Sequence, residues 1–326
     1  MKRIAVLDDY QDIARLMPGW DSLADRAAIA VFRDTLTSLD ALAERLEPYE
    51  ILVPIRERTR FTRALLERLP RLELLALAGR NTGQVDIQTA TARGVLVTES
   101  EGSGAGAVEL TMGLIIAAVR RVPHEDRAIR EGRWQTGLGV ELAGKTLGIV
   151  GLGRIGRRIA AFGILLGMRV LAWGPTLTAE RAAASQATYL PLDQVLAESD
   201  VVSLHLRLSD GTRGVIGARE IALLKPTAYL INTARGPLVD EEALVAALRE
   251  RRFAGAALDV FHQEPIPRDH PLLALDNVVL TPHVGFVTQE TYRSFYSQAA
   301  ESIADYLSGR TPARLLNPMA QAQPRR

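Results

Sequence analysis

The fold is decided by one segment, Thr146-Leu147-Gly148-Ile149-Val150-Gly151-Leu152-Gly153-Arg154-Ile155-Gly156. Its first five residues form a buried-strand pattern, and a helical pattern follows the glycines as far as Leu166. Gly151 permits a tight turn, Gly153 lets backbone N–H groups approach a pyrophosphate, and Gly156 lets helix and strand pack closely. Because the helix N-terminus then faces the anion, the segment predicts a dinucleotide-binding loop of the Rossmann type.

Short apolar runs alternate with helical patterns on both sides of this loop. The runs before it are Ile4–Leu7, Ile29–Phe32, Ile51–Val53, Leu74–Leu77 and Val95–Val97, and those after it are Arg169–Trp173, Val201–Leu204, Ala228–Asn232 and Gly255–Leu258. Amphipathic stretches such as Leu39–Leu46 and Thr62–Leu69 lie between them. This alternation is typical of parallel α/β layers.

The chain is long enough for more than one domain. A length of 326 residues suggests about two cores. The Gly-rich segment from Gly102 to Gly106 and the apolar helical run Leu110–Val119 separate the two series, and the last helical pattern, Gln289–Leu307, is expected to return to the first domain. We predict an α/β protein with two doubly wound parallel-sheet domains. Residues 1–101 and 287–326 form the substrate domain, and residues 102–286 form an inserted Rossmann-type NAD(P)-binding domain with a crossing helix.

Composition excludes several classes of protein. The formal net charge is +1 and basic residues are scattered among acidic ones, so nucleic acid is not an expected partner. The chain has no cysteine, which excludes disulfides, thiolate metal sites and cysteine nucleophiles, and no metal site is predicted. The N-terminus lacks a secretory-signal pattern, and the longest apolar run is about half of what a bilayer needs. We expect a cytoplasmic protein without a membrane segment.

Three further segments follow the glycine loop in a characteristic order. They are Ile231-Asn232-Thr233-Ala234-Arg235-Gly236, Asp259-Val260-Phe261-His262-Gln263-Glu264-Pro265 and Leu280-Thr281-Pro282-His283. With the loop, they resemble the signatures of the D-isomer-specific 2-hydroxyacid dehydrogenases of the phosphoglycerate dehydrogenase-like kind. The resemblance covers nearly the whole chain. It implies hydride transfer between a nicotinamide cofactor and a small 2-keto or 2-hydroxy acid, with Arg235, Glu264 and His283 as catalytic residues.

The chemistry of such a reaction calls for these residue types. Hydride transfer to a keto carbon leaves an alkoxide, and a histidine is the natural proton donor near neutral pH. His283 would be the acid/base, and Glu264 behind its ring would favour the imidazolium and fix its orientation. Arg235 would hold the substrate carboxylate through paired hydrogen bonds.

The cofactor contacts are expected along the second domain. They are Gly151, Gly153, Arg154, Ile155, Gly156, Trp173, Gly174, Thr176, His205, Thr233, Ala234, Asp259 and His283. At the end of the second strand, NAD sites usually place an acidic residue on the ribose 2′-hydroxyl, but this chain has Gly174 there. No Arg or Lys follows at once either, although Arg181 is within a few residues. NAD is favoured as the cofactor, and NADP stays open.

Substrate contacts are expected in the first domain as well. The resemblance places Arg80, Asn81 and Thr82 where backbone N–H groups meet the substrate carboxylate. Arg56 and Arg58 resemble a loop that faces the substrate's phosphate in phosphoglycerate dehydrogenases. Which 2-hydroxy acid is used stays open.

Two other functions compete with this interpretation. A formate-oxidising relative would not normally need a His–Glu pair, because formate has no hydroxyl to deprotonate. A cofactor-sensing corepressor of the same fold would act through a partner surface, and no basic arm or long polar tail is present. The resemblance further implies a homodimer, to which the helix containing Leu110–Val119 contributes, and no regulatory domain is expected after the last helix.

Overall fold

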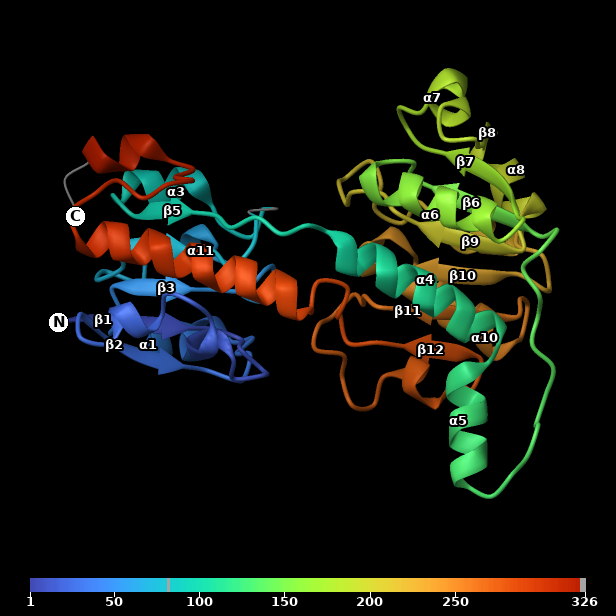
Figure 1. Cartoon of the computed structure of the whole chain (residues 1–326), viewed down its shortest axis with the longest axis horizontal. Helices are drawn as coiled ribbons and strands as arrows, with labels where there is room; N and C mark the ends of the chain where they lie inside the picture. Colours follow the sequence, from blue (N-terminus) through green and yellow to red (C-terminus); the bar gives the residue numbers. More distant parts are fainter. Residues whose placement is uncertain (81–82, 323–326) are drawn as a thin grey trace. The chain divides into compact units, whose positions relative to one another are not determined.

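The computed structural model describes residues 1–80 and 83–322, and the chain divides into two compact units (Figure 1). Unit 1 comprises Met1–Ser103 and Thr288–Arg326, and unit 2 comprises Gly104–Val287. The domain boundaries predicted from the sequence lie between residues 101 and 102 and between residues 286 and 287. Each unit has its own parallel sheet, which confirms the predicted fold class of two parallel-sheet α/β domains.

Unit 1 is built on a parallel sheet of strand order β2-β1-β3-β4-β5. The strands are β1 (Lys2–Val6), β2 (Ala27–Val31), β3 (Ile51–Val53), β4 (Leu74–Ala76) and β5 (Leu96–Thr98). The helices are α1 (Leu39–Leu46), α2 (Arg63–Leu66), α3 (Ile87–Ala92) and α11 (Gln289–Leu307), with 3₁₀ turns η1 (Ala14–Leu16), η2 (Asp21–Leu23) and η5 (Pro318–Ala322). The central strands are buried on both faces, as parallel sheets require.

Helix α11 joins unit 1 although the whole of unit 2 separates it from β1–β5 in the sequence. It packs against β4 and buries Tyr292, Phe295 and Tyr296. The indole N–H of Trp20 donates to the carbonyl of Tyr296 at 3.0 Å, and the two rings meet edge to face. These aromatic side chains of α11 are therefore core residues of unit 1.

Unit 2 is built on a longer parallel sheet of order β12-β11-β10-β9-β6-β7-β8. Its strands are β6 (Thr146–Val150), β7 (Arg169–Trp173), β8 (Thr188–Tyr189), β9 (Val201–Leu204), β10 (Tyr229–Asn232), β11 (Gly255–Leu258) and β12 (Val278–Leu280). Its helices are α4 (Ala105–Val119), α5 (Val122–Arg130), α6 (Arg154–Leu165), α7 (Ala179–Ala183), α8 (Leu192–Glu198), α9 (Ala218–Ala222) and α10 (Glu241–Arg249), with 3₁₀ turns η3 (Gly236–Leu238) and η4 (Pro271–Ala274).

Two helical layers cover this sheet. Helices α4 and α6 pack on one face around Ile115 and Ile159, and α8, α9 and α10 pack on the other around Leu196, Ile221 and Leu244. The strand order reverses between β6 and β9, because β7 and β8 continue to one side and β10 to β12 to the other. In open α/β sheets, a ligand binds beyond the carboxyl ends of the strands at such a switch point.

Candidate active site

The glycine loop joins β6 to α6 at the switch point, and its glycines have distinct surroundings. Gly151 has φ +105°, and a β-carbon there would lie 2.7 Å from the carbonyl carbon of His205. A β-carbon on Gly156 would lie 2.2 Å from the Gly151 oxygen. By contrast, one on Gly153 would meet nothing within 4 Å, so this side of the loop is open. The turn and the helix packing need glycine at 151 and 156, and the open face at 153 leaves room for a dinucleotide phosphate.

The other predicted cofactor residues of the loop lie beside it. Arg154 begins α6, and its guanidinium lies against Gly104, where a β-carbon would be 2.5 Å from Nη2. Ile155 packs on the apolar core below the loop. Trp173 ends β7 next to the loop, since the Gly151 N–H donates to the Trp173 carbonyl at 2.7 Å, and Gly174 follows the strand. Thr176 is exposed on the turn that follows.

His205 lies directly after β9, on the other side of the switch point. Its backbone N–H donates to the Val150 carbonyl at 2.8 Å, and its Nε2 is 2.9 Å from the Ser203 hydroxyl. Burial lowers the pKa of His205 from its ordinary value of 6.5 to about 4. The imidazole is therefore neutral at neutral pH, and it is the backbone of His205 that lies against Gly151.

The turn after β10 carries Arg235. The Asn232 side chain brackets this turn, because its amide N–H donates to the Arg235 carbonyl and its oxygen accepts from the Ala234 N–H, both at 3.0 Å. The Arg235 guanidinium donates to the Ala234 carbonyl at 2.6 Å. The hydroxyls of Thr233 and Thr111 lie 2.7 Å apart, which ties the turn to α4. Asn232 and Thr111 were not among the predicted site residues.

Gly236 brings this turn against the segment after β11. A β-carbon at Gly236 would lie 2.2 Å from the carbonyl carbon and oxygen of Phe261, so no larger residue fits. Three residues farther on, Glu264 accepts a hydrogen bond from the Phe261 N–H at 2.9 Å through Oε1. Its other oxygen, Oε2, is left pointing to the segment after β12.

Asp259 holds the segment that carries His283. Its buried carboxylate accepts from the Thr281 hydroxyl at 2.6 Å, the Val284 N–H at 2.8 Å and the Gly285 N–H at 2.9 Å. Burial raises the pKa of Asp259, and the hydrogen bonds oppose that shift. His283 itself has φ +52°, a left-handed conformation that is uncommon for residues other than glycine.

The result is a close pair of His283 and Glu264. Nδ1 of His283 lies 2.5 Å from Oε2 of Glu264, and the Phe286 ring packs edge-on against the imidazole. Both side chains are partly exposed, with accessible fractions of 22% and 34%. The carboxylate thus fixes the ring through one nitrogen and leaves Nε2 for another partner. Arg235, Glu264 and His283 follow β10, β11 and β12, which are neighbours in the sheet.

The predicted residues of unit 1 lie at the carboxyl edge of its own sheet. Arg56 follows β3 and lies over Gly79, where a β-carbon would be 2.7 Å from Arg56 Cδ. Arg80 follows β4 and forms an ion pair with Glu101. The Arg58 guanidinium donates to the Asp8 carbonyl at 2.6 Å and stacks on the Tyr10 ring. Asn81 and Thr82 lie outside the described residues.

Residues 1–80 and 83–322 lack two features that would indicate other classes of function. In that part of the chain, no helix combines the length and apolar character needed to cross a membrane. Nor does it contain a group of three or more His, Cys, Asp or Glu side chains arranged to hold a metal ion.

Comparison with known proteins identifies the family. Residues 112–285 match the family model of the D-isomer specific 2-hydroxyacid dehydrogenase, NAD binding domain. A glyoxylate reductase of Aeropyrum pernix is 44% identical over 78% of this chain and 78% of its own length. The chain belongs to the D-isomer specific 2-hydroxyacid dehydrogenases, NAD-dependent oxidoreductases that act on CH–OH donors.

Solved structures agree with this assignment. The crystal structure of a phosphoglycerate oxidoreductase from Vibrio cholerae superposes with a TM-score of 0.90 at 38% identity, covering 95% of this chain and 100% of that one. A D-lactate dehydrogenase from Aquifex aeolicus, complexed with NAD and lactic acid, superposes with a TM-score of 0.76 at 26% identity, covering 94% and 96%. The resemblance seen in the sequence is confirmed, and so is NAD as the cofactor.

The depressed pKa of His205 predicts a pH-dependent stability. Because the folded-state pKa of about 4 lies below the unfolded value of 6.5, the native state favours the neutral ring. The stabilisation is complete above pH 6.5 and is lost as the pH falls toward 4, at up to about 1.4 kcal/mol per pH unit. Urea unfolding of the parent and of His205→Gln between pH 4.5 and 7.5 measures it. We expect the parent's free energy of unfolding to exceed that of His205→Gln by less as the pH falls. A difference between the two free energies that stays constant with pH would show that the buried neutral ring does not contribute in this way.

Proposed function

We propose that this chain reduces a small 2-keto acid to the 2-hydroxy acid, or catalyses the reverse, with His283 as the acid/base. The observation that carries the proposal is the 2.5 Å contact between His283 Nδ1 and Glu264 Oε2, beside Arg235 at the carboxyl edge of the unit 2 sheet. A bound nicotinamide supplies or accepts the hydride. The side chains of unit 2 would then bind the acid and move the proton.

The glycine loop fits the dinucleotide. Gly153 offers an open backbone face at the start of α6, and Gly151 is held in a conformation that only glycine adopts easily. Arg154, Ile155, Trp173, Gly174, Thr176 and His205 would line the adenosine and phosphate side. Thr233, Ala234, Asp259 and His283 would line the nicotinamide side. The location proposed for the protein is the cytoplasm, in keeping with a cysteine-free chain.

The proton path in this proposal is short. Hydride addition to the keto carbon leaves an alkoxide, and Nε2 of a protonated His283 donates to it while Nδ1 stays bonded to Glu264. The carboxylate of Glu264 stabilises the imidazolium form and keeps the ring from turning. Arg235 binds the substrate carboxylate, because its planar guanidinium offers paired donors. A formate oxidase would have no use for this His–Glu pair.

Unit 1 would contribute further substrate contacts. Arg56 and Arg80 lie on the loops after β3 and β4, and these loops meet where Arg56 covers Gly79. Asn81 and Thr82 belong to the same proposal. Arg58 is proposed to act through the loop it holds, since its guanidinium already bonds the Asp8 carbonyl and stacks on Tyr10. Glyoxylate, hydroxypyruvate and 3-phosphohydroxypyruvate are the acids to compare.

Replacing His283 tests the proposal directly. We expect His283→Gln to lower kcat for keto-acid reduction by at least about 10²-fold, because a positioned proton donor typically contributes 10²–10⁴-fold. NADH binding, followed by nicotinamide fluorescence, should stay within about twofold of the parent, since other groups hold the dinucleotide. The rate is measured at the nicotinamide absorbance, with the three keto acids above as substrates.

A second histidine of unit 2 serves as the control. His124 lies on α5 near the amino ends of β10 and β12, at the opposite edge of the sheet. His124→Gln should leave kcat unchanged for every acid that the parent reduces. If His283→Gln kept a rate near that of the parent, His283 would not be the proton donor.

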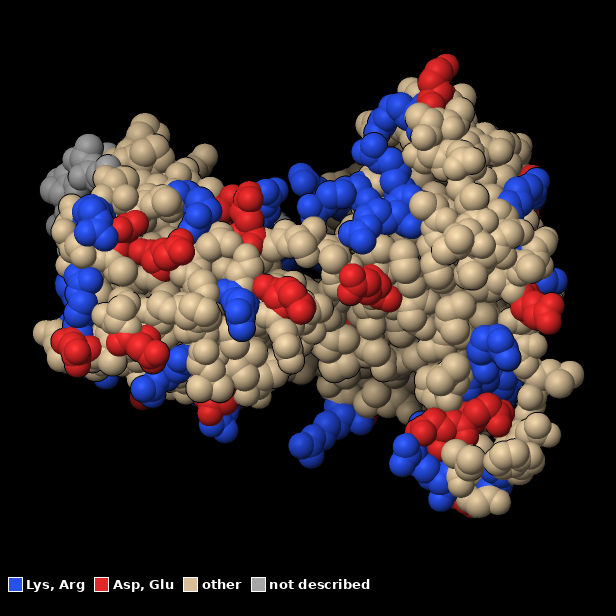
Figure 2. All heavy atoms as spheres, in the orientation of Figure 1, with Lys and Arg blue, Asp and Glu red and all other residues tan. Residues whose placement is uncertain are grey.

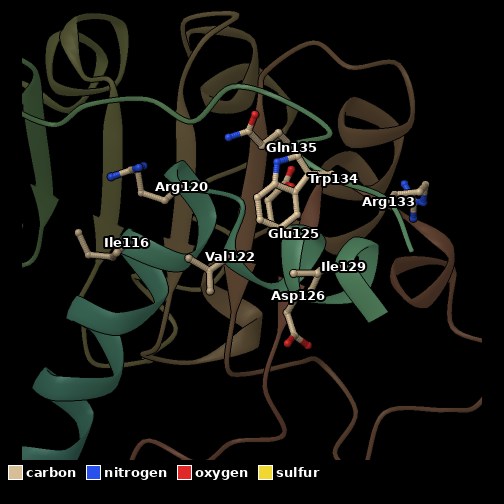
Figure 3. A pocket seen from close by; sticks show the side chains of 9 residues that line it. All are labelled: Ile116, Arg120, Val122, Glu125, Asp126, Ile129, Arg133, Trp134 and Gln135. Carbon is tan, nitrogen blue, oxygen red and sulfur yellow. The ribbon is translucent and has the colours of Figure 1, made fainter. Parts of the chain in front are cut away.

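We also propose a homodimer formed through α4, α5 and the segment after α5. Large apolar side chains stay exposed there, among them Val122 (51%), Ile129 (55%) and Trp134 (75%). With Ile116 they line an open hollow of about 560 Å³ (Figure 3). A contiguous apolar patch of this kind marks an association surface, and a second copy of the chain would cover it in a symmetric pair.

Light scattering at micromolar concentration tests this assembly. We expect the parent to have twice the mass of one chain and the double variant Ile129→Glu, Trp134→Glu to have the mass of one, because buried charges oppose association. Leu165→Glu, on an exposed leucine of α6, is the matched control and should leave the dimer intact. A parent that scatters as a single chain would rule the dimer out.

A further inference from the structure

The end of β7 lacks the acidic side chain that usually contacts the 2′-hydroxyl of the cofactor's ribose. The residue there is Gly174, and its neighbours on the following turn are Pro175 and Thr176. Sites restricted to NAD place an Asp or Glu here, where it accepts a hydrogen bond from the ribose hydroxyl and repels a 2′-phosphate. Unit 2 has neither the acceptor nor the repulsion at this position.

Packing does not require glycine at this position. A β-carbon on Gly174 would have only ordinary contacts, 3.5 Å from Leu177 Cβ and 3.9 Å from Gly151 Cα, and the residue's φ is not in the left-handed region. The second of these distances also shows that the end of β7 adjoins the glycine loop. A side chain, or a ligand group in its place, therefore has room beside that loop.

An arginine is held at the same turn. The Gly174 carbonyl accepts from the Leu177 N–H at 3.1 Å, which closes the turn, and the Arg181 guanidinium donates to the Thr176 carbonyl at 2.6 Å. This bond uses one of the five N–H donors of the guanidinium. The arginine is an exposed residue of α7, and its guanidinium reaches back to the turn that begins at Gly174. The guanidinium is thus close to the expected position of the ribose of a dinucleotide bound at the Gly151 loop.

The nearest acid does not replace the missing carboxylate. Glu180 is engaged with its own backbone N–H and with the Thr178 hydroxyl, and these hydrogen bonds lower its pKa. Thr178 in turn caps α7 by accepting from the Arg181 N–H at 3.3 Å. Figure 2 shows basic side chains along the face of unit 2 below α7, with an acidic one at its tip.

We propose that the 2′ site of unit 2 accepts a phosphate, with the Arg181 guanidinium as its ligand, so that the chain binds NADP(H) as well as NAD(H). This inference rests on the proposed cofactor site around Gly151–Gly156. A planar guanidinium binds a phosphate through paired hydrogen bonds, and the absent carboxylate at 174 removes the usual discrimination. The ribose hydroxyl of NAD(H) meets the same turn without repulsion.

Binding measurements on the full chain test the inference without turnover. NADH and NADPH are titrated separately, and nicotinamide fluorescence gives each Kd. For the parent, we expect the two Kd values to lie within about tenfold of each other, because nothing at Gly174 opposes the phosphate. Arg181→Ala should weaken NADPH by about tenfold or more and leave NADH within about twofold, because it removes a charged phosphate ligand.

A second variant adds the missing acid instead of removing the arginine. Gly174→Asp restores the acid, and should weaken NADPH by about tenfold or more while NADH binds at least as tightly. Arg252→Ala is the matched control, since this exposed arginine precedes β11 at the amino edge of the sheet and pairs with Glu250. It should change neither Kd. Titration with adenosine 2′,5′-bisphosphate against 5′-AMP isolates the same phosphate and should show the same loss in Arg181→Ala.

The outcomes separate the two proposals. NADH binding with NADPH at least about a hundredfold weaker in the parent would overturn the dual specificity and leave the cofactor site standing. An equal change of both Kd values in Arg181→Ala would overturn the role of Arg181. A parent that binds neither dinucleotide would overturn the cofactor site at Gly151–Gly156, and the inference with it.

Discussion

The candidate site depends on the buried carboxylate of Asp259. It begins the segment after β11, yet its hydrogen bonds go to the Thr281 hydroxyl and to the N–H groups of Val284 and Gly285, which follow β12. These bonds surround His283 and hold its backbone at φ +52°. Leaving one such buried N–H without an acceptor costs about 1–3 kcal/mol. The position of the imidazole is therefore set by a neighbouring strand, and Glu264 then fixes the direction of the ring.

The parallel sheet explains how distant residues reach one place. Arg235, Glu264 and His283 are separated along the chain, but they follow β10, β11 and β12, whose carboxyl ends lie side by side. Gly236 lets two of these segments touch, because a β-carbon would collide with Phe261. Gly151 plays the same part at the switch point against His205. In both cases, glycine is needed for a close approach between loops and not for flexibility.

Much of this arrangement could be predicted from the sequence. Buried parallel strands are short apolar runs, so Ile51–Val53, Arg169–Trp173, Val201–Leu204 and Gly255–Leu258 were predicted with their observed bounds. The edge strand β8 was not predicted, because its two residues are exposed and form no apolar run. The edge strand β12 was not predicted either, although Val278–Leu280 is an apolar run as short as Ile51–Val53. Residue type alone could not separate Tyr292, Phe295 and Tyr296, which are core residues of unit 1, from Trp134, which is exposed.

The contacts that hold the site residues in position could not be predicted from the sequence. Asn232 hydrogen-bonds across the turn that carries Arg235, and Thr111 of α4 contacts Thr233. Such contacts depend on the tertiary structure, including the path of α4 across the sheet, and no local sequence pattern predicts that path. The same holds for Arg58, whose guanidinium is committed to the Asp8 carbonyl and the Tyr10 ring. Motif spacing identifies which residues carry chemistry. The tertiary structure determines which groups hold them in position.

A crystal structure of the Asp259→Asn variant, compared with one of the parent, tests whether the Asp259 carboxylate positions His283. An amide keeps one acceptor oxygen but turns an NH₂ group toward one of the three donors, so the Val284–Gly285 segment loses a partner. We expect residues 283–285 to move and His283 Nδ1 to separate from Glu264 Oε2, while β11 and β12 keep their register. A variant in which the segment stays in place and the His283–Glu264 contact persists would contradict it.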